Sequence, residues 1–222
     1  MKQTLLLLFI FLTLGMAKVD NVVVTTQMKD KVIFQGKEYI LFDYLLEHYF
    51  AENPEKKPKL QIESSALDRG YISEFEIIEN QLYLVDIKIQ VRDKTSKDLK
   101  VELISVFQNV FPETKRKKVD WKTGFLLLPY GELKSQYTYP NTYSNYWVLE
   151  LKRGNLTQTR NYTNEELNNF KTRQFKKFKS TREYRKLIKC FKKTNKKVIK
   201  GDEMDYGIHK GILDYTEKFL TE

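Results

Sequence analysis

Acidic side chains on one predicted β-hairpin have the spacing in this chain that best suits acid–base chemistry. Residues 71–92 alternate apolar and polar side chains on either side of a turn, which is typical of two paired strands with one face in water. Glu74, Glu76 and Asp86 therefore lie in one hairpin, together with Lys88. Two neighbouring carboxylates can act as a general acid and a general base. Cross-strand ion pairs on a solvated sheet face are the commoner arrangement, and we favour them here.

Arg69, which precedes Gly70 at the start of the same hairpin, is the first residue to consider for binding. A guanidinium group binds a carboxylate or a phosphate through two parallel hydrogen bonds, and glycine allows a close backbone approach. The structural alternative is a buried arginine–carboxylate pair that holds a loop at the head of a strand. We favour this alternative.

A group of aromatic residues follows further along the chain. Exposed tyrosine and tryptophan offer rigid, amphipathic surface that suits glycan or protein partners. The favoured alternative places several of them in the hydrophobic core. The residues concerned are Tyr137, Tyr139, Tyr143, Tyr146 and Trp147.

Histidine and cysteine are too few for common metal or nucleophile chemistry. The chain contains only His48, His209 and Cys190, whereas a zinc site usually takes three or four ligands. One cysteine cannot form an intramolecular disulfide, and its apolar neighbours predict a buried, inert thiol. The motifs G-x-S-x-G, H-E-x-x-H and C-x-x-C do not occur, and neither does a phosphate-binding glycine loop. The sequence therefore predicts no cofactor and no metal.

Positive charge is concentrated in one segment. Residues 171–200 carry 14 basic side chains and one acidic side chain, whereas residues 18–170 carry 22 of each. Such a segment attracts anionic lipid headgroups or lipopolysaccharide phosphates, at about 1 kcal/mol per Lys or Arg near a membrane. The alternative is a charged face that only keeps the protein soluble. The predicted contact residues are Lys186, Lys189, Lys192 and Lys193.

The elements that position these residues are predicted to be strands up to about residue 162 and helices after it. Besides the hairpin, alternation predicts strands at residues 31–35, 38–42, 99–104, 121–129, 143–152 and 156–162. We expect Asp43 to cap a short helix at residues 44–50. Capping boxes begin helices near residues 163 and 180, and glycines then break up the tail before a last helix within residues 212–220. The fold class is α+β: an antiparallel β-sheet domain, a sandwich or half-barrel, followed by C-terminal amphipathic helices.

Several short motifs keep an order that resembles an uncharacterised family of small bacterial proteins. They are residues 65–71 (SALDRGY), 75–77 (FEI), 82–84 (LYL), Trp121 and 124–131 (GFLLLPYG). The family core reads T-A-x-W-R-G-Y, W-E-I and L-Y-L, and the similarity covers roughly residues 32–156. Asp68 stands in place of tryptophan, and residues 140–143 replace a glycine-rich segment. The resemblance implies a shared fold unit and no mechanism.

The N-terminus has the pattern of an export signal. Lys2 precedes an apolar run at residues 5–14, and residues 15–17 place small side chains beside a cleavage point before Lys18. The run is shorter than the roughly 20 residues that a spanning helix needs. We expect a signal peptide at residues 1–17, an antiparallel β domain at 18–162, and a basic helical region at 163–222 that is packed on it or appended to it. The expected location is the periplasm or the exterior.

Two classes of function remain open at this point. The first is a non-enzymatic exported binding module, whose basic helices contact an anionic surface or another protein; export makes nucleic acid an unsuitable partner. The alternative is a hydrolase that uses carboxylates near Arg69 and the hairpin of residues 71–92. A deep pocket with at least two carboxylates favours the enzyme, and a flat sheet favours binding.

Export can be tested directly. N-terminal sequencing of the exported protein should begin at Lys18 or within a few residues of it, because the peptidase needs small side chains beside the cut. Recovery of a membrane-bound form that starts at Met1 would contradict cleavage.

Overall fold

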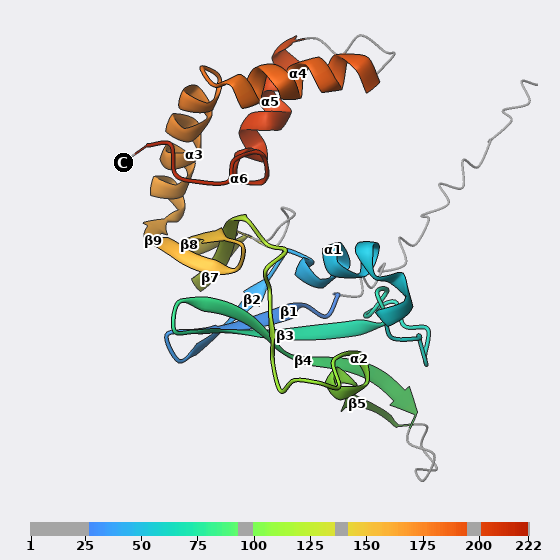
Figure 1. Ribbon diagram of the computed structural model, residues 1–222. Helices are drawn as coiled ribbons and strands as arrows, with labels where there is room; N and C mark the ends of the chain where they lie inside the picture. Colours follow the sequence, from blue (N-terminus) through green and yellow to red (C-terminus); the bar gives the residue numbers. More distant parts are fainter. Residues whose placement is uncertain (1–26, 93–99, 136–141, 195–200, 222) are drawn as a thin grey trace, which may run out of the picture.

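A nine-stranded mixed sheet followed by a helical region makes up the part of the chain that the computed structural model describes, residues 27–92, 100–135, 142–194 and 201–221 (Figure 1). The main strand order is β2-β1-β3-β4-β9-β8-β7, and β5 and β6 also pair with β4. The strands are β1 (Asp30–Phe34), β2 (Lys37–Leu41), β3 (Tyr71–Ile78), β4 (Gln81–Arg92), β5 (Val101–Ser105), β6 (Lys117–Lys118), β7 (Gly124–Ser135), β8 (Thr142–Lys152) and β9 (Asn155–Thr163). The predicted α+β class is confirmed.

The sheet curls until its two end strands meet. Tyr39 of β2 contacts Tyr130 of β7 with ring centroids 6.1 Å apart. Phe34 of β1 contacts Trp147 of β8 edge-on at 5.6 Å. β4 and β9 share a single residue pair, Gln81 with Asn155, so the two halves of the sheet are joined over a short length. The main core contains buried residues from both halves of this curled sheet, which we call the half-barrel.

One strand pair departs from the antiparallel expectation. β1 and β3 pair in parallel over Lys31–Ile33 and Glu74–Glu76. β2 runs antiparallel to β1 and therefore ends beside the first residue of β1. β3 begins at this same end of the sheet and pairs with the other edge of β1. Parallel pairing therefore follows from the long connection through α1 between β2 and β3.

The sequence predicts tight hairpin turns at residues 36–37, 80–81 and 154–155, and the three turns lie one residue earlier in the structure. Their central residues are Gln35-Gly36, Glu79-Asn80 and Arg153-Gly154, and all six have φ between 49° and 72°. A two-residue type I′ turn requires positive φ at both central positions, and glycine or asparagine takes the second. The alternation of apolar residues locates each hairpin but does not show which residue comes first in its turn.

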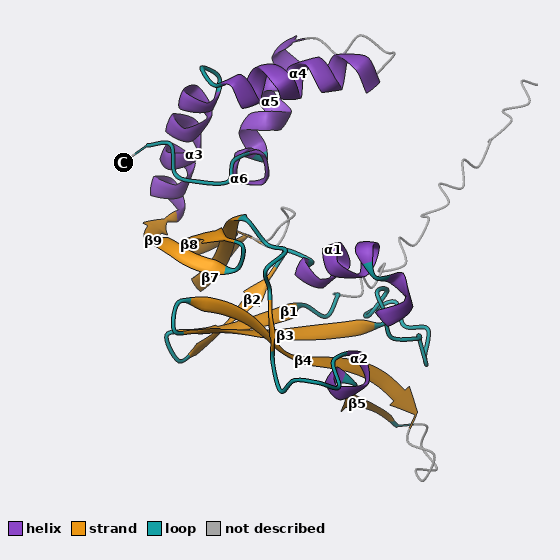
Figure 2. Cartoon of the chain, in the orientation of Figure 1, coloured by secondary structure: helices purple, strands orange, loops and turns teal. Residues whose placement is uncertain are grey.

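Helix α1 (Leu45–Glu52) covers the half-barrel and contributes Leu45, Leu46 and Phe50 to the main core (Figure 2). The expected cap is wrong: Tyr44 occupies the N-cap position without a side-chain hydrogen bond. Asp43 instead forms an ion pair with Lys122 at 3.3 Å. Two short helical turns, η1 (Pro54–Lys56) and α2 (Phe107–Val110), lie in the connections.

Four helices follow the sheet: α3 (Asn164–Phe178), α4 (Arg182–Thr194), α5 (Gly201–Lys210) and α6 (Ile212–Tyr215). The capping box at Thr163 and Glu166 is confirmed. The second cap lies one residue later than expected, because the Tyr184 N–H donates to Thr181 Oγ1 at 3.2 Å. The expectation that glycines break up this segment is wrong for two of them, because Gly201 begins α5 and Gly207 lies inside it. A glycine inside a helix costs about 1 kcal/mol relative to alanine. None of the described helices is long and apolar enough to cross a membrane.

The buried Gln174 of α3 fastens the C-terminal segment to the helices. Its amide donates to Thr216 Oγ1 at 3.1 Å and to the Lys218 carbonyl at 2.8 Å, and its oxygen accepts from the Leu220 N–H at 2.9 Å. Phe219 of the same segment packs between Phe125 of β7 and Phe170 of α3. The helical region is thereby packed on the sheet.

Replacing this amide should loosen that attachment. Gln174→Leu keeps the approximate volume but leaves two acceptors and one donor without their partner, so we expect a loss of about 1–3 kcal/mol in the free energy of unfolding. Urea unfolding followed by circular dichroism measures it. The matched control, exposed Asn169→Leu on the same helix, should change stability by less than about 0.5 kcal/mol. Equal effects of the two substitutions would contradict the assigned role.

Candidate functional site

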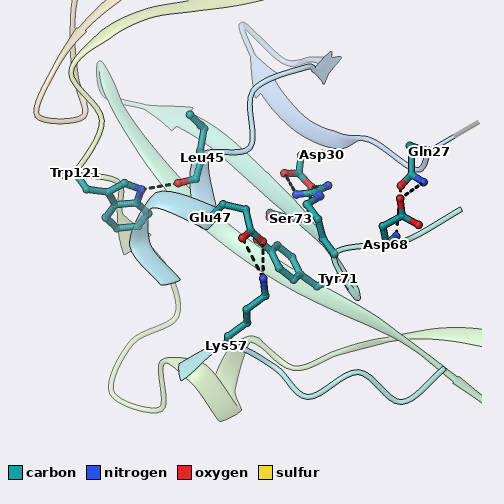
Figure 3. A network of polar contacts seen from close by, with 10 residues as sticks. Gln27, Asp30, Leu45, Glu47, Lys57, Asp68, Tyr71, Ser73 and Trp121 are labelled. Atoms are coloured by element: carbon teal, nitrogen blue, oxygen red, sulfur yellow. Dashed lines mark hydrogen bonds and ion pairs between the residues drawn. The ribbon is translucent and has the colours of Figure 1, made fainter. Parts of the chain in front are cut away.

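Arg69 belongs to a buried polar network at the head of β3, through contacts with Asp30 and Tyr71. Figure 3 shows this network, with Asp30, Tyr71 and Ser73 labelled. Its guanidinium donates two hydrogen bonds to Asp30, with Nη1–Oδ2 at 2.9 Å and Nη2–Oδ1 at 3.0 Å. The Asp30 side chain is 0% exposed, and its Oδ1 also accepts from the Ser73 N–H at 2.8 Å. A buried carboxylate needs such partners because an unpaired charge away from water is very costly.

The network continues through tyrosines to helix α1. The Arg69 guanidinium lies over the rings of Tyr44 and Tyr71, 4.2 Å and 5.1 Å from their centroids. The Tyr71 hydroxyl donates to Glu47 Oε1 at 2.6 Å, and Lys57 Nζ lies 3.0 Å from both Glu47 oxygens. The loop before β3, the start of β1 and α1 are therefore held together by one set of contacts.

The ionisation of these groups follows from their partners. Burial alone raises the pKa of Glu47, but the hydrogen bonds from Tyr71 and Lys57 and the charges of Lys57 and Arg69 outweigh it, so the pKa lies below its usual value. Burial opposes the charged form of Arg69, yet Asp30 raises the pKa of its guanidinium above the usual range. Burial, and then the hydrogen bond to Glu47, raise the pKa of Tyr71. All three groups thus keep their ordinary charge at neutral pH.

This geometry is the structural alternative that the sequence allowed for Arg69. Both Nη atoms of the Arg69 guanidinium donate to Asp30, and the guanidinium lies over the rings of Tyr44 and Tyr71. Gly70 has φ of +82°, and a Cβ there would approach Leu60 Cδ1 to 3.0 Å, so its backbone turn accounts for the glycine. The two hydrogen bonds to Asp30 and the two aromatic rings therefore give Arg69 a structural role.

Two of the three hairpin carboxylates, Glu74 and Asp86, form ion pairs with Lys88, as the solvated-face interpretation predicts. Lys88 Nζ lies 2.5 Å from Glu74 and 3.6 Å from Asp86, which sit opposite each other on β3 and β4. Asp86 also accepts from the Ser105 hydroxyl at 2.6 Å. Among the described residues, no three His, Cys, Asp or Glu side chains come together as metal ligands.

The aromatic group is divided by the fold. Tyr137 and Tyr139 lie outside the described residues. Trp147 is half-buried, stacks on Tyr130 at 6.4 Å and contacts Phe34. The Tyr146 side chain is buried, and its hydroxyl accepts from the N–H of the half-buried Tyr143 at 2.7 Å. The described members therefore contribute mainly to packing.

Helix α4 gathers the predicted contact lysines on one exposed face. Lys186, Lys189, Lys192 and Lys193 are all exposed, as are Arg182 and Arg185. Within the described part of the chain, none of these six cations forms an ion pair with a carboxylate. In Figure 1 the helix runs across the top of the view, at the end of the helical region away from the sheet. This face therefore carries six exposed cations side by side.

The opposite face of α4 rests on its neighbours. Its apolar residues are half-buried in a small core around Phe178, Ile208 and Ile212. Tyr184 contacts Phe178 at 5.8 Å and donates its hydroxyl proton to Asp205 of α5, and burial followed by this bond raises the pKa of Tyr184 to about 12. Asp205 also pairs with Lys179. The expected buried thiol is wrong: Cys190 is exposed, because it lies about 100° round the helix from Phe191 and off the apolar stripe.

Sequence reasoning missed a groove of about 1040 Å³ between α4, the C-terminal segment and the ends of β7 and β8. Leu151, Phe178 and Leu187 are among its apolar lining residues, and Glu150, Glu183, Asp214 and Glu217 contribute carboxylates. Glu150 uses both oxygens, accepting from the Phe219 N–H and the Thr157 hydroxyl at 2.7 Å each. Neither Arg69 nor the hairpin carboxylates line this groove. No signal in the sequence brings these distant segments together.

No known family, curated protein or solved structure matches the chain. The resemblance of the motifs around Arg69 to a bacterial family therefore stays a prediction. The geometry described above is the basis for any statement about function.

The structural role of Arg69 can be measured. Arg69→Met keeps much of the apolar contact but leaves the Asp30 carboxylate buried and unpaired, so the free energy of unfolding should fall by about 3–5 kcal/mol. Lys88→Met, which breaks a partly exposed pair, is the control and should cost less than about 1 kcal/mol. Urea denaturation compares the two. An Arg69→Met protein as stable as the control would show that the pair does not hold the loop.

Proposed function

We propose that this chain is an exported, non-enzymatic binding module whose α4 helix contacts an anionic membrane surface through lipid headgroup phosphates. The single observation that carries the proposal is the exposed face of α4, where six cations lie together without an ion pair among the described residues. The half-barrel acts as a scaffold for this helix.

Charge repulsion is the physical argument. Cations three and four positions apart on a helix, such as Lys186, Lys189 and Lys193, repel each other and destabilise it. The neighbouring Lys179 is neutralised by Asp205, and residues 18–170 balance their charges. Glu183 is the acidic side chain of this helix, and the charges of Lys186 and Arg182 contribute to lowering its pKa. We infer that the negative charge of a binding partner offsets the remaining repulsion. Phosphate headgroups supply that charge at high surface density.

The contact is expected to be electrostatic rather than an insertion of the helix. The apolar stripe of α4 packs on α5 and α6, with Phe191 against Tyr215 at 6.2 Å, so only the cationic face is free to meet the membrane. Exposed charges are screened within about 8 Å at physiological ionic strength. Binding should therefore weaken steeply between low and physiological salt.

The groove beside α4 is the feature that favours the hydrolase alternative, because it contains four carboxylates. Burial, and then the charge of Asp43, raise the pKa of one of them, Asp214. The carboxylates predicted for this alternative lie elsewhere: Asp30 is paired with Arg69, and two of the hairpin carboxylates are paired with Lys88. We prefer the binding module because none of the carboxylates near Arg69 or on the hairpin lines the groove. The exposed face of α4 could instead serve only to keep the protein soluble. The vesicle-binding test below distinguishes this role from membrane contact.

Charge reversal on α4 tests the proposal. Changing Lys186, Lys189, Lys192 and Lys193 to Glu should reduce co-sedimentation with phosphatidylglycerol vesicles by at least about 100-fold at low salt, since each Lys contributes about 1 kcal/mol near the surface. The apolar stripe is untouched, so thermal melting should stay close to that of the wild type.

The matched control reverses four exposed lysines elsewhere, Lys37, Lys59, Lys115 and Lys152, which gives the same net charge. It should retain most of the binding. Phosphatidylcholine vesicles should not bind the wild type, and a separate arm with lipopolysaccharide distinguishes the two sources of phosphate. Equal binding to neutral vesicles, no wild-type binding, or equal loss in the control would leave α4 as a solubilising face.

A further inference from the structure

One side of α4 lines the groove described above. The α4 residues concerned lie three, four and seven positions apart, so they share one face of the helix. They are Glu183, Lys186, Leu187 and Cys190. Helix α6, the C-terminal segment after it and the end of β8 supply most of the other lining residues. In Figure 1 this C-terminal segment, drawn in red, runs between α4 above it and the sheet below it.

This face of α4 lies between the cationic face and the apolar stripe. At about 100° per residue, Glu183 and Cys190 lie near its centre. Lys186 lies about 60° to one side of Glu183 and belongs to the cationic face, whereas Leu187 lies about 40° to the other side and belongs to the apolar stripe. A lipid headgroup bound at the cationic face is therefore next to the groove.

The groove contains charges of both signs that are not paired with one another. Within the described part of the chain, none of its ionic side chains forms an ion pair, and all except Glu150 are exposed. They are Lys152, Lys186 and Lys218, and Glu150, Glu183, Asp214 and Glu217. A groove that gathers ammonium groups and carboxylates without pairing them suits a ligand that carries both charges itself.

Apolar surface is open in the same groove. Leu187 and Leu220 are half-buried, and Tyr215 is 37% exposed, so each leaves part of its side chain accessible. The volume of about 1040 Å³ equals that of the larger sites that bind small molecules. An amphiphilic molecule with a charged end therefore fits the groove better than a small ion does.

We propose that the groove binds one phospholipid molecule with a phosphoethanolamine headgroup. The phosphate pairs with lysines of the groove, the primary ammonium donates to its carboxylates, and the start of the acyl chains contacts Leu187 and Leu220. The inference rests on the proposed membrane contact of α4, because that contact brings phospholipid to the edge of the groove.

Two other common headgroups lack part of this match. The quaternary ammonium of choline has no N–H to donate to a carboxylate, and a glycerol headgroup has no positive charge. A hydrogen bond between an ammonium and a carboxylate is roughly twice as strong as one between neutral groups. The groove should therefore prefer phosphoethanolamine to both.

Cys190 provides a reporter inside the groove, because it is exposed and is the only cysteine of the chain. Dihexanoyl phosphatidylethanolamine, a short-chain lipid that dissolves as monomers, should slow the alkylation of Cys190 by N-ethylmaleimide in the exported protein, and the effect should saturate. The phosphatidylcholine and phosphatidylglycerol with the same chains should need concentrations about tenfold higher for equal protection, which corresponds to the loss of one charged hydrogen bond.

Glu217→Gln and Lys218→Gln each remove one charge from the groove. Both side chains are exposed and form no hydrogen bond or ion pair among the described residues, so thermal melting should stay close to that of the wild type. Each change should raise the half-protecting concentration of phosphatidylethanolamine by about tenfold. Glu113→Gln and Lys115→Gln, which are exposed and line no part of the groove, are the matched controls and should leave it unchanged. Every rate is compared with that of the same protein without lipid.

The inference is overturned if phosphatidylethanolamine gives no protection, if the three headgroups protect equally, or if the controls shift protection as much as the groove variants. The membrane contact of α4 is tested separately, since phosphatidylglycerol vesicles contain no ammonium group. Vesicle binding without protection of Cys190 would overturn this inference alone. Protection without vesicle binding would support the groove site and overturn the membrane contact.

Discussion

Burial of the Asp30 carboxylate at the start of β1 constrains how the surrounding segments come together. A charge with no exposure to water must have a cation and hydrogen-bond donors close to it. Arg69 supplies the cation, 39 residues further along, and the Ser73 N–H supplies another donor. Both donors belong to the chain at or just before β3. Satisfying this one carboxylate therefore requires β3 to begin beside the start of β1, which is the parallel pairing that the structure shows.

The same constraint extends to the helix that covers the half-barrel. While bound to Asp30, the Arg69 guanidinium also lies over the rings of Tyr44 and Tyr71, and Tyr71 is in turn hydrogen-bonded to Glu47 of α1. On the other side of α1, the Trp121 Nε1–H donates to the Leu45 carbonyl at 2.9 Å. The helix is thus tied to β3 and to the segment before β7. These contacts join the start of β1, the start of β3 and α1 into one network.

The two surfaces with unsatisfied interactions lie on elements outside this network. Helix α4 carries cations without ion pairs among the described residues, and β5 carries an open edge with apolar side chains. The proposed contact with an anionic surface depends on the first of these. Positive charge is also concentrated in this segment of the sequence, whereas residues 18–170 carry equal numbers of basic and acidic side chains.

The sequence by itself determined the local structure of this protein. Strand alternation located the hairpins to within one residue, and hydroxyl-to-glutamate spacing located the start of α3 at Thr163. The apolar stripe and the cationic face of α4 also followed from helical periodicity alone. These features depend on residues a few positions apart, where the period of the pattern reflects the backbone geometry directly. Even here, apolar spacing could not determine which turn residue takes positive φ first.

Only the tertiary structure decided which distant residues meet. It paired Arg69 with Asp30, closed the half-barrel through Tyr39 and Tyr130, and left β5 at an open edge. It also turned Cys190 to the solvent and formed the groove beside α4 from three separate segments. Partner choice over such separations depends on chain topology and on the desolvation of whole surfaces. A pattern with a period of two or of 3.6 residues contains no information on either, so these contacts could not be predicted.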